Sequence, residues 1–127
     1  MKRLILDTNI AVAFLNDNID IVNKIDEFDV FYLPITVCGE LYFGAANSNR
    51  RTYNERRLKR FIKSCKILNS DLEVAKEYAA IRLELKQKGN PIPENDIWIA
   101  ATCLTYQLPV ATFDKHFGYV EGINLFL

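Results

Sequence analysis

Cysteine and histidine are scarce in this sequence, and they form no metal-binding pattern. The 127 residues contain three cysteines, Cys38, Cys65 and Cys103, and a single histidine, His116. The cysteines are odd in number, have no zinc-site spacing and lie among apolar residues, so we interpret them as reduced, buried thiols. We interpret the lone histidine as structural. No serine or cysteine nucleophile with a histidine base is evident, which disfavours covalent hydrolase chemistry.

Long apolar runs are also missing. No stretch approaches the roughly 18 to 20 apolar residues of a membrane span. Only three apolar residues separate Arg3 from Asp7, which is too few for the core of a secretory signal. The composition, 50% hydrophobic and 25% charged, is typical of a soluble globular protein. We expect a cytoplasmic protein with no membrane partner, folded as one domain over residues 1–127.

The sequence has no net charge, but its charges are unevenly distributed. Residues 50–66 contain eight basic residues and one acid, a net charge of +7, whereas residues 1–49 carry −4 and residues 67–127 carry −3. A basic segment beside acidic regions could bring a polyanion to an acidic, metal-filled site. It could equally be a solvated helix without a partner, and the charge pattern alone favours neither interpretation.

Short apolar runs alternate with helical patterns along the chain. The run at 3–7 is apolar on successive residues, which is typical of a strand covered on both faces. Further strands are predicted at 30–33, 65–68 and 110–113, with a weaker fifth at 123–126. Helices are predicted at 8–16, 18–28, 36–47 and 52–64, from Ser70 to Gly89, and from near Glu94. Ser70 and Glu73 fit a capping box at the start of the fifth helix.

This alternation predicts an α/β fold. We expect a single-domain three-layer α/β/α architecture around a parallel sheet of about five strands. In such sheets, ligands bind beyond the carboxyl ends of the strands, where the winding direction switches. The polar residues at those ends are therefore the first candidates for a functional site.

Two aspartates follow predicted strands. Asp7 ends the first strand where a helix begins, and Asp114 comes just past the strand at 110–113. Each could be no more than a helix cap or a turn residue, because aspartate is common in both roles. Their equivalent positions in the topology nevertheless place both at the same end of the sheet.

Two further acids lie in mostly apolar helices. Glu40 is the only acid between Asp29 and Glu55, and Gly39 and Gly44 remove bulk beside it. A carboxylate on such a helix is costly to bury unless it is paired or metal-bound, although a solvent-facing position would also accommodate it.

Asp96 lies in the first turn of an otherwise apolar helix. It could simply favour the helix dipole there. Several converging carboxylates cannot all stay ionised without cations between them. Ligation by carboxylate oxygens selects Mg²⁺ or Mn²⁺ over zinc, and such ions can activate water for phosphoryl displacement.

The four acids lie in the segments LILDTNIAVAFL, ELYFGAA, NDIWIAATCL and PVATFDKHF. In order and flanking residues these segments resemble the PIN domain and, within it, the toxin nucleases of VapBC-type toxin–antitoxin pairs. The resemblance runs from about residue 3 to the end of the chain. It implies a PIN-like parallel sheet and an Mg²⁺- or Mn²⁺-dependent endoribonuclease that leaves a 5′-phosphate. It also implies frequent homodimers and a partner antitoxin that covers the site.

The resemblance also implies roles for particular residues. The residues expected to hold the metal and carry catalysis are Asp7, Glu40, Asp96 and Asp114, of which Asp114 completes the site or orients the attacking water. The polar residues that match supporting positions of the family are Thr8, Asn9 and Thr112. The candidates for RNA phosphate contact are Arg50, Arg51, Arg56, Arg57, Lys59 and Arg60. A partner protein or solvent would suit these basic residues equally well.

Three other functions were weighed against this one. A phosphatase of the haloacid-dehalogenase type needs a second aspartate two residues after the first, where this chain has Asn9. A response-regulator receiver needs an aspartate at the end of a middle strand, where this chain has Pro34 or Asn69. A non-catalytic RNA- or protein-binding module with a PIN fold remains open, since metal ligands can be present in a protein that does no chemistry.

Overall fold

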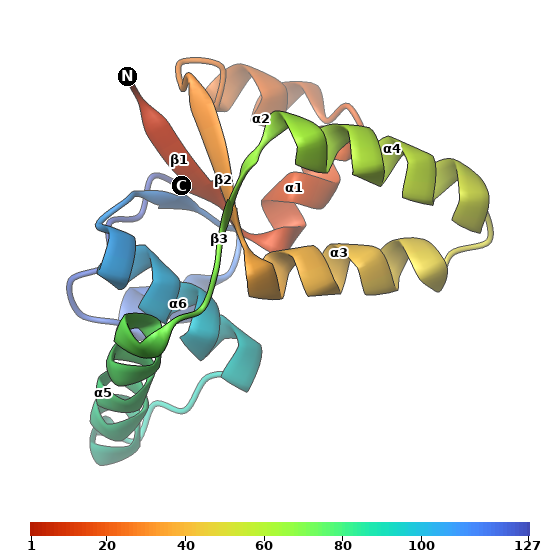
Figure 1. Ribbon diagram of the computed structural model, residues 1–127. Helices are drawn as coiled ribbons and strands as arrows, with labels where there is room; N and C mark the ends of the chain where they lie inside the picture. The colour runs from red at the N-terminus through yellow and green to blue at the C-terminus, as the bar shows by residue number, and fades with distance from the viewer.

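Four parallel strands form the sheet at the centre of the molecule (Figure 1). The computed structural model describes all residues from Met1 to Leu127. The strands are β1 Arg3–Leu6, β2 Val30–Pro34, β3 Lys66–Leu68 and β4 Val110–Ala111, and they lie in the order β3-β2-β1-β4. The predicted α/β fold with a parallel sheet is confirmed.

The sheet has four strands rather than about five. The segment predicted as a fifth strand, 123–126, forms only an isolated parallel bridge between Val110 and Leu125. Its backbone does reach β4, since Val110 donates to the carbonyl of Asn124 and Phe126 donates to that of Val110, both at 2.9 Å. Because β4 is only two residues long, it offers too few pairing positions for a further strand to form.

Six α-helices and one 3-10 helix connect the strands. They are α1 Thr8–Leu15, α2 Ile19–Lys24, α3 Ile35–Ala46, α4 Arg51–Ser64, α5 Leu72–Lys88, α6 Glu94–Tyr106 and the 3-10 helix Lys115–Tyr119. The chain winds from β1 through β2 to β3 and then returns past them to β4. With right-handed crossovers, this reversal puts α1–α4 on one face of the sheet and α5–α6 on the other. Figure 1 shows this arrangement, and the predicted three-layer architecture is confirmed.

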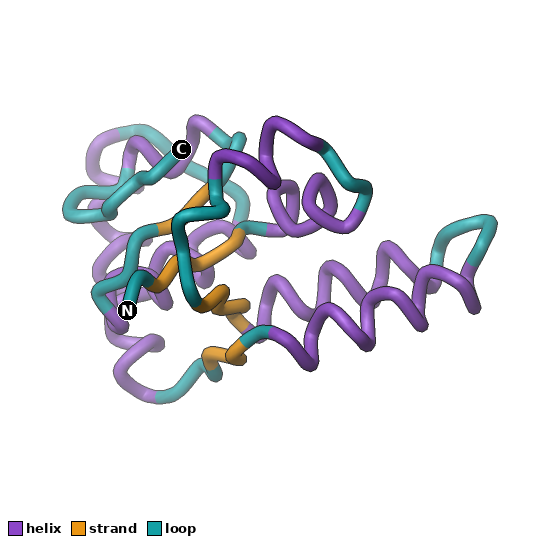
Figure 2. Tube along the Cα trace, turned by 90° about the horizontal axis from the view of Figure 1, so that it is seen from above, coloured by secondary structure: helices purple, strands orange, loops and turns teal.

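Helices α3 and α4 form a long antiparallel pair. The two helices contact each other along their length, and Figure 2 shows the pair extending well beyond the sheet. Helix α2 is shorter than the predicted 18–28, since it ends at Lys24 and the chain turns before β2. The pair α3–α4 carries both a candidate metal ligand, Glu40, and the basic segment.

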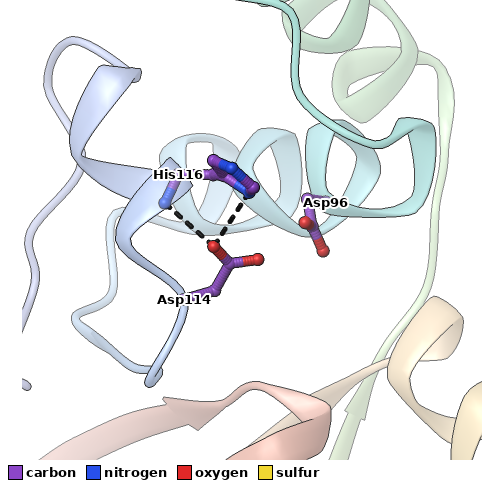
Figure 3. A group of neighbouring side chains, drawn as sticks. All are labelled: Asp96, Asp114 and His116. Atoms are coloured by element: carbon purple, nitrogen blue, oxygen red, sulfur yellow. Dashed lines mark hydrogen bonds and ion pairs between the residues drawn. The ribbon is translucent and has the colours of Figure 1, made fainter.

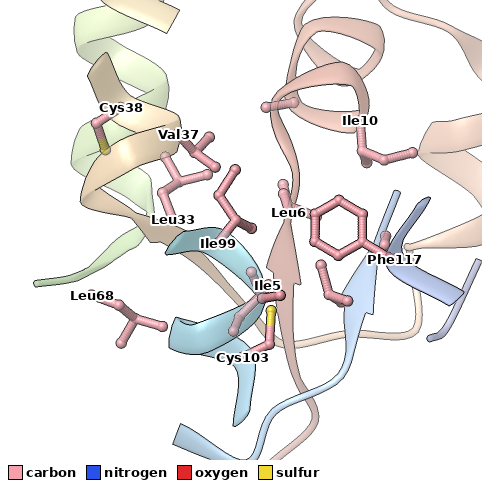
Figure 4. Close-up of a cluster of buried hydrophobic side chains, with 14 of the residues drawn as sticks. Ile5, Leu6, Ile10, Leu33, Val37, Cys38, Leu68, Ile99, Cys103 and Phe117 are labelled. Carbon is pink, nitrogen blue, oxygen red and sulfur yellow. The ribbon is translucent and has the colours of Figure 1, made fainter. Parts of the chain in front are cut away.

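The core requires cover on both faces of β1. Leu4, Ile5 and Leu6 are all fully buried, and successive residues of a strand point to opposite faces. Figure 4 shows this cluster, with Ile99 and Cys103 of α6 among its members. The predicted two-sided burial of the first strand is therefore confirmed.

Helix α5 begins one residue later than the capping box predicts. The cap is Asp71, whose Oδ1 accepts a hydrogen bond from the backbone N–H of Val74 at 3.1 Å. Aspartate and serine are equally good helix caps, and the negative charge of aspartate also interacts favourably with the positive end of the helix dipole. This explains why the cap is Asp71 and not Ser70. The predicted end is confirmed, since Gly89 has φ +74°, a left-handed conformation that suits glycine.

The three cysteines are free thiols. Cys38 and Cys103 are buried, and Cys65 is half-buried. Burial raises the pKa of the Cys65 thiol to about 11, so the thiolate that reacts and binds metals is absent near neutral pH. No helix of the chain has both the length and the apolarity that a membrane crossing demands.

Candidate active site

The candidate site lies where the winding of the sheet reverses. Strand β1 has β2 on one side and β4 on the other, and the chain passes to these neighbours in opposite directions. Asp7 directly follows β1, and Thr112 and Asp114 follow β4. The carboxyl ends of these two strands flank the switch point, which is where open α/β sheets bind ligands.

Asp7 is a buried carboxylate. Its side chain is 4% exposed. Oδ1 accepts a hydrogen bond from the N–H of Thr8 at 2.8 Å, and Oδ2 accepts one from the hydroxyl of Thr112 at 2.6 Å. Burial raises the pKa of Asp7; the two hydrogen bonds oppose this rise, and repulsion by Glu40 and Asp114 adds to it. A cation at this position would remove both unfavourable effects.

Polar side chains join the loops after β1 and β4. The Thr112 hydroxyl, besides donating to Asp7, accepts from the N–H of Asp114 at 2.9 Å. The Asn9 carbonyl oxygen accepts from the N–H of Phe113 at 3.1 Å, and its amide donates to Asp7 at 3.5 Å. Thr112 and Asn9 therefore fix the distance between Asp7 and Asp114.

Glu40 reaches the site from α3. The Thr8 hydroxyl donates to Oε1 of Glu40 at 2.8 Å. The backbone N–H of the same residue donates to Oδ1 of Asp7. Glu40 is half-buried, while its neighbours Cys38 and Leu41 point into the core. Its charge interacts with both Asp7 and Asp96. Glu40 therefore faces the other acids and not bulk solvent alone.

Asp96 and Asp114 share a tightly coupled environment. Burial, a hydrogen bond with Asp114 and the charges of Asp7, Asp114 and Glu40 together raise the pKa of Asp96 to about 7. For Asp114, burial acts upward, but hydrogen bonds from His116 and Asp96 outweigh it and lower the pKa. In the metal-free protein, Asp96 therefore keeps its proton at pH values well above those at which an ordinary aspartate loses it, while Asp114 is ionised.

His116 belongs to this group, which the sequence interpretation missed. Its Nδ1 lies 3.0 Å from Oδ1 of Asp114, and its backbone N–H donates to the same oxygen at 2.9 Å. Ligand atoms of Asp96, Asp114 and His116 all lie within 4.8 Å of one another (Figure 3). The spacing Asp-x-His at 114–116 was the available signal, because an aspartate that caps a short turn brings the residue two positions later beside it.

The four predicted acids thus converge, but not equally. Asp96, Asp114 and His116 form the compact group, and Asp7 and Glu40 are linked to it by Thr112, by Thr8 and by mutual repulsion. Carboxylate oxygens in this number, two of them on raised-pKa groups, fit a hard divalent ion such as Mg²⁺ or Mn²⁺. The predicted supporting residues Thr8, Asn9 and Thr112 all make hydrogen bonds within the site.

Glu40 lines two cavities. The first, of about 540 Å³, is lined by Thr8, Thr36, Gly39, Glu40, Phe43 and Asn95. The second, of about 240 Å³, lies between α1, α3 and α4, and both Glu40 and Arg57 line it. Both cavities therefore adjoin the acidic site at Glu40.

The predicted phosphate contacts differ in their surroundings. Arg57 lines the cavity that also contacts Glu40, and its guanidinium lies 5.4 Å from the Tyr53 ring centre. The Arg50 guanidinium lies 4.0 Å from the centre of the same ring, and Arg51 pairs with Glu55 at 3.3 Å. The remaining candidates, which are exposed on α4 and form no ion pair, are Arg56, Lys59 and Arg60. Of these candidates, Arg57 alone lines a cavity that one of the four acids, Glu40, also lines.

Fold and site together define a class: an α/β domain with clustered acids at the switch point of a parallel sheet, suited to metal-assisted chemistry on phosphates. The family model of the PIN domain matches residues 4–123. The chain therefore belongs to the PIN domain family. This membership argues against a phosphatase of the haloacid-dehalogenase type.

Relatives and solved structures agree with this membership. The chain is 27% identical to ribonuclease VapC2 of Rickettsia felis, over 94% of this chain and 93% of that protein. It is 30% identical to VapC ribonuclease Y4jK of Sinorhizobium fredii, over 96% and 94%. Its fold matches FitAcB from Neisseria gonorrhoeae with a TM-score of 0.88 at 30% identity, covering 98% of this chain and 96% of that one. It also matches the DNA-bound VapBC from Salmonella typhimurium with a TM-score of 0.86 at 25% identity, covering 98% and 97%.

Proposed function

We propose that this protein is a divalent-metal-dependent endoribonuclease and the toxin of a toxin–antitoxin pair. The observation that carries the proposal is Asp7, a carboxylate held almost fully out of solvent with other acids close enough to raise its pKa. Such an arrangement stabilises the fold poorly without a cation, so it is better explained by a reaction that needs one. The similarity to VapC ribonucleases supports RNA as the substrate.

Asp7, Glu40, Asp96 and Asp114 would hold Mg²⁺ or Mn²⁺. The bound ion supplies positive charge that polarises the scissile phosphate and favours ionisation of a water molecule. The protein contributes the fixed positions of the metal ligands. Thr112 and Thr8 hold Asp7 and Glu40 in fixed orientations through bonds of 2.6 and 2.8 Å, and preorganised ligands of this kind need no rearrangement during the reaction.

Asp114 would orient the attacking water. It is half-buried and its lowered pKa keeps it ionised, so it can accept a hydrogen bond from water. The water oxygen forms a bond to phosphorus as the bond to the ribose 3′-oxygen breaks, and the leaving oxygen takes up a proton. The products are a 5′-phosphate and a 3′-hydroxyl. His116 holds Asp114 in place through its backbone N–H.

Arg57 is the best candidate for contact with the RNA backbone. It lines the same cavity as Glu40, so a phosphate held there would lie along a path to the acids. We further propose that the protein forms homodimers and that a cognate antitoxin covers the site. The similarity in fold to the DNA-bound VapBC of Salmonella typhimurium supports an antitoxin partner.

The experiment is an RNA digest with chemical analysis of the ends. Purified protein is incubated with mixed structured and single-stranded RNAs, with EDTA, Mg²⁺ or Mn²⁺. Internal cleavage that requires the metal and leaves 5′-phosphates is expected. Cleavage that persists in EDTA, or 2′,3′-cyclic phosphate ends, would rule out this mechanism. RNA binding without cleavage would favour the non-catalytic module.

A further inference from the structure

Phe43 stands at the edge of the larger cavity beside Glu40. Its side chain is 70% exposed, although it is among the largest apolar side chains of the protein. The other lining residues are threonines, glycine, glutamate and asparagine, so Phe43 is the only apolar member of the lining. Ile35 and Tyr42 of α3 are also exposed, but neither lines the cavity. The lining itself, with one ring among polar groups, differs from the broad apolar surface that a protein helix needs for docking.

Helix geometry links Phe43 to the carboxylates. Glu40 and Phe43 are three residues apart on α3, so they share a face of the helix. Glu40 accepts the Thr8 hydroxyl at 2.8 Å and is part of the acidic site. The Phe43 ring therefore lies about one helical turn from the groups that would act on a phosphate.

Gly39 gives independent support for an occupant. It lies in the interior of α3, where glycine weakens a helix relative to alanine. No heavy atom lies within 4 Å of the position that a Cβ of residue 39 would take. Packing within the protein thus does not require a glycine, and an added Cβ would enter open space at the lining of the cavity.

We propose that this cavity, the Phe43 cleft, binds one unstacked base of single-stranded RNA, with the Phe43 ring stacked on the face of the base. Thr36 and Asn95 supply hydroxyl and amide groups to the edge of the base. A nucleobase has an aromatic face and a polar edge. This lining offers an aromatic ring for the face and polar groups for the edge. The inference rests on the proposed ribonuclease function and adds a position at which the enzyme contacts a base.

The test measures the Kd of a labelled single-stranded RNA of mixed sequence in Mg²⁺. The protein carries Asp7→Asn, so that cleavage does not consume the RNA. Phe43→Ala and Phe43→Leu are expected to raise Kd about 5- to 100-fold, because base–aromatic stacking is lost, while Phe43→Trp restores binding. The matched control is Tyr42→Ala, an exposed aromatic on the same helix that does not line the cleft, and it leaves Kd unchanged.

Two further arms separate stacking from other contacts. An abasic RNA backbone should bind equally to proteins with Phe43 and with Phe43→Ala. Gly39→Ala should raise the melting temperature yet weaken RNA binding, because its methyl group occupies the cleft. Unchanged Kd in Phe43→Ala, or full binding by Phe43→Leu, overturns the inference. So does a Phe43→Ala protein that binds RNA normally but changes its oligomeric state, which would make this face an interface between copies.

The outcome is distinguishable from failure of the proposed function. If the protein with native Asp7 does not cleave RNA but the Phe43 variants show the expected Kd pattern, the ribonuclease activity fails and the base site stands. If that protein cleaves RNA and the Phe43 variants bind like their parent, the base site fails and the activity stands. Absence of any RNA binding overturns both.

Discussion

The hydroxyl oxygen of Thr112 lies 2.6 Å from Oδ2 of Asp7, although 105 positions separate the two residues in the chain. This bond joins the ends of β1 and β4, and the same hydroxyl accepts the N–H of Asp114. One small side chain therefore orients two of the proposed metal ligands.

Thr112→Val tests this role. Both Asp7 and Thr112 are buried, so the substitution leaves Oδ2 of Asp7 with only the long 3.5 Å bond from the Asn9 amide and leaves the Asp114 N–H without a partner. We expect the free energy of unfolding to fall by about 1–3 kcal/mol and RNA cleavage to drop strongly. The control is Thr105→Val, which removes a hydroxyl bonded only to a carbonyl within α6. Unfolding by denaturant and a cleavage assay give both readouts, and equal effects of the two substitutions would contradict the role of Thr112.

The metal-free protein should lose stability as pH rises toward neutral. The pKa of Asp96 is about 7 in the folded protein and 3.8 for an unperturbed aspartate, so between these pH values the folded state binds more protons than the unfolded state. The free energy of unfolding therefore falls as pH increases through this window. Burial raises the pKa of Asp7 in the same direction.

Melting in EDTA from pH 4 to pH 8 checks this prediction. Asp96→Asn should flatten the decline, because its side chain does not titrate. If the melting temperature rises across this range, and rises equally in the unsubstituted protein and in Asp96→Asn, then Asp96 is not held protonated by its neighbours.

Divalent ions should stabilise the protein through the acidic site. A ligand that binds only the folded state at about 100 times its Kd adds about 2.7 kcal/mol. We expect Mg²⁺ or Mn²⁺ to raise the melting temperature, and Glu40→Gln to reduce that rise. Asp26→Asn, which removes an exposed acid outside the site, should not. Calorimetric titration measures the same affinity directly, and equal binding by all three proteins would place the metal elsewhere.

Arg57→Glu should weaken RNA binding more than charge reversal elsewhere. Loss of one phosphate contact lowers the slope of log K against log salt by about 1. Lys86→Glu on the exposed surface of α5 makes the same change of charge away from the site. The measurement is the RNA-binding constant of both variants as a function of salt concentration. Matching slopes would assign the basic segment to a partner protein or to solvent.

The sequence predicted those parts of the site that depend on strand ends. Asp7 and Asp114 could be placed because each follows an apolar run, and parallel strands bring their carboxyl ends to one edge. Glu40 could be suspected because a lone acid on an apolar helix needs a partner. These positions depend on local pattern and simple topology.

Other features depended on details that no local pattern contains. His116 joins the acids only because Asp114 caps a short 3-10 helix and turns the chain back on itself. The segment 123–126 has a strand pattern, but the two-residue β4 leaves it almost nothing to pair with. Helix α5 is capped by Asp71 and not by Ser70. Either side chain can cap a helix, so the sequence does not determine at which of the two residues the helix begins. The exposure of Phe43 and the cavity beside it depend on the tertiary arrangement around α3, which no local pattern contains.

The most direct test of the account compares Asp7→Asn with the unsubstituted protein in two measurements on the same samples: the initial rate of RNA cleavage in Mn²⁺ and the melting temperature in EDTA. We predict that cleavage falls by at least about 100-fold, as expected when a metal ligand is lost. The metal-free melting temperature should stay the same or rise, because the repulsion from Glu40 and Asp114 is relieved. Retained cleavage, or a loss of activity explained by a large fall in melting temperature, would contradict the assignment of Asp7 to a metal-dependent active site.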